Sequence, residues 1–142
     1  MTAPPLLILA LALGAFAAPA LADPCKAIPD KGPMPSYLYR GAQFTGPVVY
    51  IGDGDSLCVE VARGPTGWVE VRLADFYAPE IREPAGPAAK AALERMAWHK
   101  PVTCTVDHQS YDRVVARCTD ARGVSLGDLM RRAGITEGGR GR

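Results

Sequence analysis

The chain has 142 residues, of which 16 are lysine or arginine and 15 are aspartate or glutamate, and 48% of the residues are hydrophobic. This length supports one globular domain and hardly a second. The net charge of +1 excludes a polycation that coats nucleic acid through its overall charge, and the hydrophobic content excludes a chain that is disordered throughout. Binding to a polyanion must therefore depend on a local group of charges.

The first 22 residues carry no charged side chain, contain an apolar run rich in Leu and Ala, and end in Ala-Leu-Ala. A small-x-small ending is typical of a signal-peptide cleavage site. Prolines and a glycine interrupt the run, which is therefore too short for a transmembrane helix. We predict that residues 1–22 are a signal peptide, that no membrane span remains after its removal, and that the protein is exported, either periplasmic or secreted.

Residues 23–46 are rich in proline and glycine and predict an extended N-terminal arm that packs on the domain. Period-two patterns then predict five strands. A helical pattern with a stripe of Ala, Leu and Met lies between the third and the fourth strand, and a short second helix ends at Gly134. The expected strands cover 47–51, 56–63, 68–75, 102–106 and 113–118, and the expected helices cover 86–99 and 126–133. Residues 136–142 read as a basic, flexible tail.

Five strands with one helix between the third and the fourth predict a mainly β fold with α elements, a five-stranded OB barrel that is followed by a short C-terminal helix. The domain would span residues 47–135, and we expect a monomer. This fold binds oligonucleotides and oligosaccharides but does not by itself determine a function. Function must therefore be inferred from the outward face and the loops.

The four cysteines are an even number, which in an exported protein indicates two disulfides. Strand alternation places Cys104 and Cys118 on the inward faces of neighbouring strands, so we predict that they bond to each other. On the chain-entropy model, closing this loop contributes about 3 kcal/mol. Cys58 then lies on the outward face, where it can bond to Cys25 of the arm.

Four sequence segments stand in a characteristic order: DGDS at 53–56, VRLADFYAPE at 71–80, GPAAKAALERM at 86–96 and YDRVVARC at 111–118. In this order they resemble the staphylococcal nuclease (thermonuclease) family, over about residues 47–135. The resemblance implies an OB barrel and Ca²⁺-dependent hydrolysis of phosphodiesters in DNA and RNA. By position, it implies that Asp55 is a metal ligand and that Arg72, Glu80 and Arg113 are catalytic.

These residue types suit phosphodiester hydrolysis. Planar guanidinium groups, as on Arg72 and Arg113, match paired phosphate oxygens and stay protonated near neutral pH. A carboxylate such as Asp55 can hold a hard divalent cation, and Glu80 can orient or deprotonate the attacking water. Each residue alone also has a plain structural interpretation, as a turn residue or as one half of a surface salt bridge. Their combination in this order favours phosphate binding.

One position departs from the family pattern. The family has a second aspartate where this chain has Tyr77, and a neutral phenol is a poor Ca²⁺ ligand. Asp75 is on the same side of an extended strand as Tyr77 but stands farther from the loop, and we do not expect it to substitute. Tyr111 is a candidate for stacking on a nucleic-acid base.

Two hypotheses follow. The first is an exported nuclease that hydrolyses phosphodiester bonds of DNA or RNA, weakly or with altered use of its metal. The second is a non-catalytic OB module that binds nucleic acid, phosphate groups or a protein partner in the cell envelope. Whether the protein is an enzyme depends on whether catalysis survives the presence of Tyr77.

Overall fold

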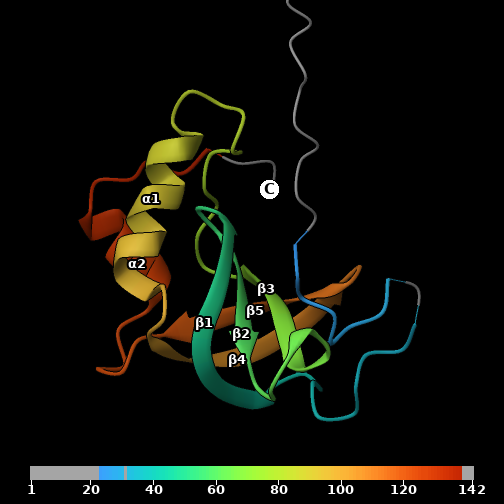
Figure 1. Ribbon diagram of the computed structural model, residues 1–142. Coiled ribbons are helices and arrows are strands. Elements are labelled where there is room, and N and C mark those ends of the chain that lie inside the picture. The colour runs from blue at the N-terminus through green and yellow to red at the C-terminus, as the bar shows by residue number, and fades with distance from the viewer. Residues whose placement is uncertain (1–22, 31, 139–142) are drawn as a thin grey trace, which may run out of the picture.

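The computed structural model describes residues 23–30 and 32–138, so the predicted signal peptide lies outside the described residues. Five strands form a closed barrel in the order β1-β2-β3-β5-β4 (Figure 1). The elements are β1 (Gln43–Asp53), β2 (Ser56–Glu60), the 3-10 helix η1 (Pro65–Gly67), β3 (Trp68–Leu73), α1 (Gly86–Ala97), β4 (Pro101–Ser110), β5 (Arg113–Thr119) and α2 (Leu126–Arg132). The predicted fold class, a mainly β barrel of the OB type with two helices, is confirmed.

The strand pairings follow from the alternation of buried and outward residues. β1, β2 and β3 form the expected antiparallel meander, and β4 and β5 form an antiparallel hairpin. β3 pairs with β5 in parallel, and β1 pairs with β4 in antiparallel fashion, which closes the barrel. Val69, Val71 and Leu73 of β3 are fully buried, whereas the residues between them point outward. The junction of β3 with β5 is short, with three register pairs from Val71 to Leu73.

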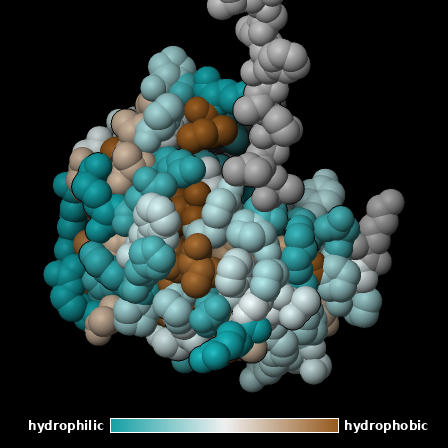
Figure 2. Space-filling view, in the orientation of Figure 1, coloured by the Kyte–Doolittle hydropathy of each residue, from teal (hydrophilic) through white to brown (hydrophobic). Residues whose placement is uncertain are grey.

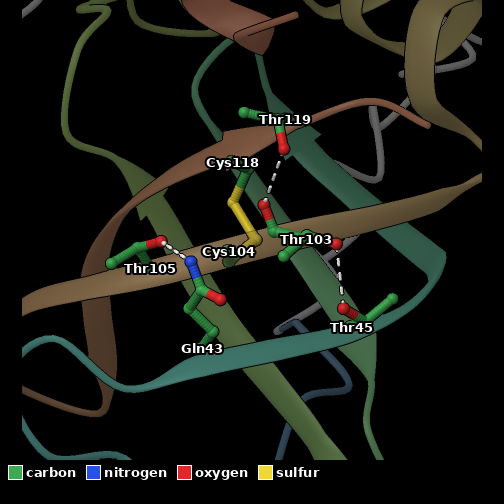
Figure 3. The surroundings of a disulfide bond; sticks show 7 residues. All are labelled: Gln43, Thr45, Thr103, Cys104, Thr105, Cys118 and Thr119. Atoms are coloured by element: carbon green, nitrogen blue, oxygen red, sulfur yellow. Dashed lines mark hydrogen bonds between the residues drawn. A yellow bond between two sulfur atoms is a disulfide. The ribbon is translucent and has the colours of Figure 1, made fainter. Parts of the chain in front are cut away.

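Strand β1 begins earlier than the sequence pattern indicated. Gln43–Pro47 pair with Pro101–Thr105 of β4, so residues 43–46, which we had expected in the arm, belong to the barrel. Side-chain contacts accompany this pairing: Thr45 Oγ1 lies 2.8 Å from Thr103 Oγ1 (Figure 3). The sequence pattern missed these residues because a glycine and a proline within the strand weaken the period-two signal.

Both predicted disulfides are present. Cys104 and Cys118 are direct partners in the register of β4 and β5, and both are fully buried (Figure 3). Cys25 bonds to Cys58 of β2 and attaches the arm to the barrel. All four cysteines are therefore bonded.

The two helices lie beside each other at one side of the barrel (Figure 1). α1 packs on β1 with Ala89, Ala92 and Leu93 fully buried, as the predicted apolar stripe requires. It ends at Ala97 rather than near the expected residue 99, because the backbone of Trp98 is extended, and His99 after it is left-handed with φ 61°. Leu126 and Met130 of α2 complete this part of the core.

On the face shown in Figure 2, hydrophobic residues form small separate patches among hydrophilic ones. Within residues 23–30 and 32–138, no helix has the length and apolar character needed to cross a membrane.

Candidate functional site

The turn between β1 and β2 positions Asp55. Asp53 Oδ1 accepts hydrogen bonds from the Asp55 amide at 3.1 Å and from Ser56 Oγ at 2.7 Å. Gly54 is required because a Cβ there would lie 2.6 Å from the Ala78 Cβ and 2.7 Å from the Ala89 Cβ. The Asp-Gly-Asp sequence is thus a packing contact between the barrel, α1 and the β3–α1 loop as well as a turn.

The carboxyl group of Asp55 lies inside the molecule. Only 6% of the residue is exposed, and its Oδ2 accepts a hydrogen bond from the Ala78 amide at 2.9 Å. Burial and the neighbouring charge of Asp53 raise its pKa to about 7, although the Ala78 amide and Arg72 act in the opposite direction. Near neutral pH this group is therefore divided between its protonated and ionised forms.

Arg72 lies on the outward face of β3, opposite Ser56 of β2. Its guanidinium carbon is 5.7 Å from the centre of the Tyr77 ring. Its Nε is buried and, within the described residues, finds no hydrogen-bond acceptor. A buried donor without a partner is costly, so this N–H is suited to an acceptor that arrives from outside, such as an anion.

Arg113 begins β5 on the same outward face. The parallel register pairs Val71 with Val114, which places Arg113 level with Glu70, two residues before Arg72. The two predicted arginines are far apart in the sequence, and the structure places them on adjacent strands of one face.

Three carboxyl groups surround this end of the face. Oxygens of Asp23, Glu70 and Asp112, which we call the acidic cluster, all lie within 4.8 Å of one another. The pKa of Glu70 is raised to about 7 by burial, by Asp23 and by Asp112, and Arg113 and Lys26 counteract the shift. The charge of Arg113 is therefore partly compensated by the protein itself.

No sequence motif pointed to the acidic cluster. Period-two alternation places Glu70 on the face of Arg72, and Asp112 stands next to Arg113 in the chain. The N-terminal arm places Asp23 beside Glu70, because Cys25 bonds to Cys58 and Cys58 is the register partner of Glu70. The predicted disulfide was the signal that could have located Asp23, because it places the start of the arm beside this strand.

Glu80 is half-buried in the β3–α1 loop, where its amide donates to Glu83 Oε2 at 3.1 Å. It lines a pocket of about 420 Å³ together with Ile81, Arg82 and Glu83. Among the described residues, no ion pair joins Glu80 to Arg72 or Arg113, so the salt-bridge interpretation of these charges has no support.

Tyr111 forms the tip of the β4–β5 hairpin. It is 83% exposed and has a left-handed backbone with φ 58°, a conformation that a bulky side chain rarely adopts. The ring projects into solvent next to Asp112 and Arg113 and is available for stacking. Asp75, by contrast, is directed toward α2: its Oδ2 accepts from Ser125 Oγ and lies 3.5 Å from Arg117 Nε. It does not supply the carboxylate that is missing at Tyr77.

A second cavity, of about 480 Å³, lies between the end of α1, the start of β4 and the loop before α2. None of the predicted site residues lines it; its polar lining is Arg95, Lys100, Asp120 and Arg122. The predicted site residues therefore lie elsewhere, with Arg72 and Arg113 on the outward face of β3 and β5.

No family model matches the sequence. One curated relative is Protein ParB of Escherichia coli, which is 42% identical over 72 residues. The match covers 51% of this chain and 38% of ParB, so the chain spans well under half the length of this relative. The comparison thus establishes similarity of a segment to part of ParB.

Proposed function

We propose that the protein binds a phosphodiester of DNA or RNA on the outward face of β3 and β5 and hydrolyses it, as the resemblance to staphylococcal nuclease implies. The observation that carries the proposal is the buried Arg72 Nε, which has no acceptor in the described residues and lies beside the Asp55 turn. A phosphate oxygen supplies the missing acceptor. Arg113, on the adjacent strand, is the second guanidinium that the same polyanion would reach.

The remaining residues fit a water attack. The Glu80 side chain borders a solvent-accessible pocket, which is suitable for holding a water molecule. The water oxygen forms a bond to phosphorus, its proton passes to Glu80, the opposite P–O bond breaks, and the leaving oxygen takes a proton from solvent. Arg72 and Arg113 balance the charge that develops on the phosphate oxygens.

The donor set at Asp55 is too poor for a resident Ca²⁺ ion. Ca²⁺ takes six to eight oxygen ligands and favours several carboxylates. Here one buried carboxyl group with a pKa near 7 already accepts the Ala78 amide, and a phenol occupies the second position. We therefore propose that any Ca²⁺ affinity of the parent protein is weak.

The substitution Tyr77→Asp tests this interpretation of the metal position. A second carboxylate beside Asp55 should raise Ca²⁺ affinity by tenfold or more, because it adds an anionic ligand. Isothermal titration with Ca²⁺ measures the change, and Tyr77→Asn serves as the uncharged control. If Tyr77→Asp binds Ca²⁺ no better than Tyr77→Asn, the loop does not present this position to a metal.

The function itself is tested by incubating the purified protein with DNA and RNA oligonucleotides in Ca²⁺, Mg²⁺, Mn²⁺ or a chelator. We expect cleavage in at least one condition and its loss in Arg72→Ala. Cleavage that is equal in Arg72→Ala and in the parent would contradict the proposal, since it would come from a contaminant or from another site.

The position of Tyr77 favours a second candidate, a module that binds phosphate groups without cutting them. The ring beneath Arg72 keeps the guanidinium in place but offers no metal ligand. Binding of an oligonucleotide in chelator, lost in Arg72→Ala and never followed by cleavage in any metal, would select this function.

Export is part of the proposal. The two disulfides support it, since such bonds persist in oxidising compartments. Fractionation of cells that express the full chain, with the mature N-terminus read by mass spectrometry, tests both the export and the cleavage before Asp23.

A further inference from the structure

We propose that residues 135–138, which we call the return segment, position the Tyr77–Ala78 backbone at the Asp55 turn and make Glu137 a positioning residue of the phosphate site. The inference rests on the proposed function. It adds to the site a part of the chain that neither the sequence motifs nor the family resemblance assigns.

The sequence turns the chain back toward the barrel at the end of α2. Gly134 has φ 80°, its amide donates to the Arg131 carbonyl, and the Ile135 amide donates to the Met130 carbonyl at 3.2 Å. This pair of bonds is a Schellman motif, which requires the left-handed residue that glycine supplies. Ile135 packs against the core, so the chain that follows runs along the barrel.

The return segment occupies both backbone groups of Tyr77. The Tyr77 amide donates to Glu137 Oε1 at 2.9 Å, and the Gly138 amide donates to the Tyr77 carbonyl at 3.1 Å. A bond from an amide to a carboxylate is stronger than one between neutral groups. Glu137 therefore holds the Tyr77 amide with a charge-assisted hydrogen bond.

Arg131 supports the same contact from α2. Its guanidinium donates to the Asp75 carbonyl, lies 3.5 Å from Glu137 Oε1, and stands 5.6 Å from the centre of the Phe76 ring. The backbone of residues 75–77 thus binds the guanidinium group of Arg131 on α2 and the carboxylate of Glu137, which follows α2 in the chain.

Two successive amides connect the return segment to the Asp55 turn. The Tyr77 amide is bound by Glu137, and the next amide, of Ala78, is bound by the buried Asp55 carboxyl group. The Tyr77 ring also lies beneath Arg72. The Tyr77 carbonyl, which accepts from Gly138, and the Ala78 amide belong to one planar peptide unit, and Glu137 holds the amide before it. Release of Tyr77 from the return segment therefore lets the Ala78 N–H and the ring on which Arg72 rests change orientation.

The test compares Glu137→Ala, Glu137→Gln and, as a matched control on α1, Glu94→Ala. Amide hydrogen exchange is measured at Tyr77 and Ala78, with Val71 and Val114 reporting global stability, and the Kd for a fluorescent single-stranded DNA oligonucleotide is measured in chelator. The Gln side chain still offers an oxygen to the Tyr77 amide but has no charge for Arg131.

We expect Glu137→Ala to raise exchange at Tyr77 and Ala78 about tenfold, the equivalent of one lost hydrogen bond, and to weaken oligonucleotide binding severalfold. Glu137→Gln should restore most of both, and Glu94→Ala should change neither. Unchanged exchange and affinity in Glu137→Ala would overturn the proposal. So would an equal rise in exchange at Val71 and Val114, because that would be general destabilisation. If the parent binds no oligonucleotide while Tyr77 and Ala78 respond as expected, the proposed function fails and the positioning role stands.

Discussion

Arg72 and Arg113 lie on adjacent strands of the same outward face, yet their surroundings differ in charge. Beside Arg72 lie the ring of Tyr77 and one buried carboxyl group, that of Asp55, which is partly protonated near neutral pH. Arg113 lies next to the acidic cluster, which carries three carboxyl groups. Among residues 23–30 and 32–138, one arginine therefore has a donor with no partner, and the other has more negative charge around it than it can balance.

The difference teaches that two arginines predicted to act alike are not equally available to an anion. A phosphate that approaches Arg72 gains a hydrogen bond that the protein leaves unmade. A phosphate that approaches Arg113 must compete with carboxylates already present, and this competition weakens as Glu70 is protonated below about pH 7.

The largest effect is expected from removing each arginine in turn. Arg72→Ala should lower the rate of oligonucleotide cleavage about 100-fold, as loss of a preorganised donor does, whereas Arg113→Ala at pH 8 should lower it less than tenfold. Single-turnover rates at saturating substrate measure both. Equal losses would show that the acidic cluster does not compensate Arg113, and melting curves verify that both variants remain folded.

A smaller effect, on stability, is expected from Asp55→Asn. The folded-state pKa of Asp55 is about 7, well above its usual value, so the folded protein retains a proton that the unfolded chain releases. The stability this provides is fully present below about pH 4 and is lost as the pH rises through 7. Asn keeps an acceptor for the Ala78 amide and carries no charge, so the variant should be more stable than the parent at pH 8, on the order of 2 kcal/mol.

Urea unfolding at pH 4 and pH 8 measures the Asp55→Asn effect, and the advantage should disappear at pH 4. The pKa of Glu70 is also raised to about 7, so Glu70 makes both the parent and the variant less stable as the pH rises. This contribution is the same in the two proteins and does not affect their difference. A variant that is less stable than the parent at pH 8 would mean that the ionised carboxylate is better compensated than its burial implies.

Glu70→Gln should change affinity modestly and in a pH-dependent way. Removing one charge from the acidic cluster makes Arg113 more available, so single-stranded DNA should bind about threefold more tightly at pH 8. At pH 5 Glu70 is already protonated, and the variant and the parent should bind equally. A gain of the same size at both pH values would point to a change in packing instead of charge.

The smallest effect on stability is expected from Tyr111→Gly. Glycine accepts the φ of 58° without strain, so the free energy of unfolding should rise by about 1 kcal/mol or less. If the exposed ring stacks on a base, affinity for single-stranded DNA should fall between three- and tenfold, at the lower end of the range for stacking contacts. Tyr111→Phe, which keeps the ring, should bind like the parent, and loss of binding in this control would assign the effect to the hydroxyl group.

Much of the fold could be predicted from the sequence because its signals are local. Alternation in Val69, Val71 and Leu73 located a strand and its buried face, and the same parity placed Cys104 opposite Cys118. Gly134 correctly ended the second helix. The start of β1 was predicted four residues too late, since only its pairing with β4, a contact across many residues, identifies Gln43 as part of a strand.

The candidate site was predictable in part. Motif order located Asp55, Arg72 and Arg113, and the structure places all three at the outward face or at its turn. What surrounds them was not predictable, because charge compensation depends on which distant segments meet. Asp23 reaches Glu70 through a disulfide, and Glu137 reaches Tyr77 through the turn after α2.

The amino-acid sequence by itself determined the order of the elements, the buried faces of the strands and the pairing of the cysteines, since each follows from periodicity within a few residues or from the parity of neighbouring strands. Only the tertiary structure decided which carboxyl groups are buried, which arginine is compensated and where the chain after α2 returns. Burial and Coulomb interactions depend on distance in space, and a closed barrel makes neighbours of residues that the sequence keeps far apart.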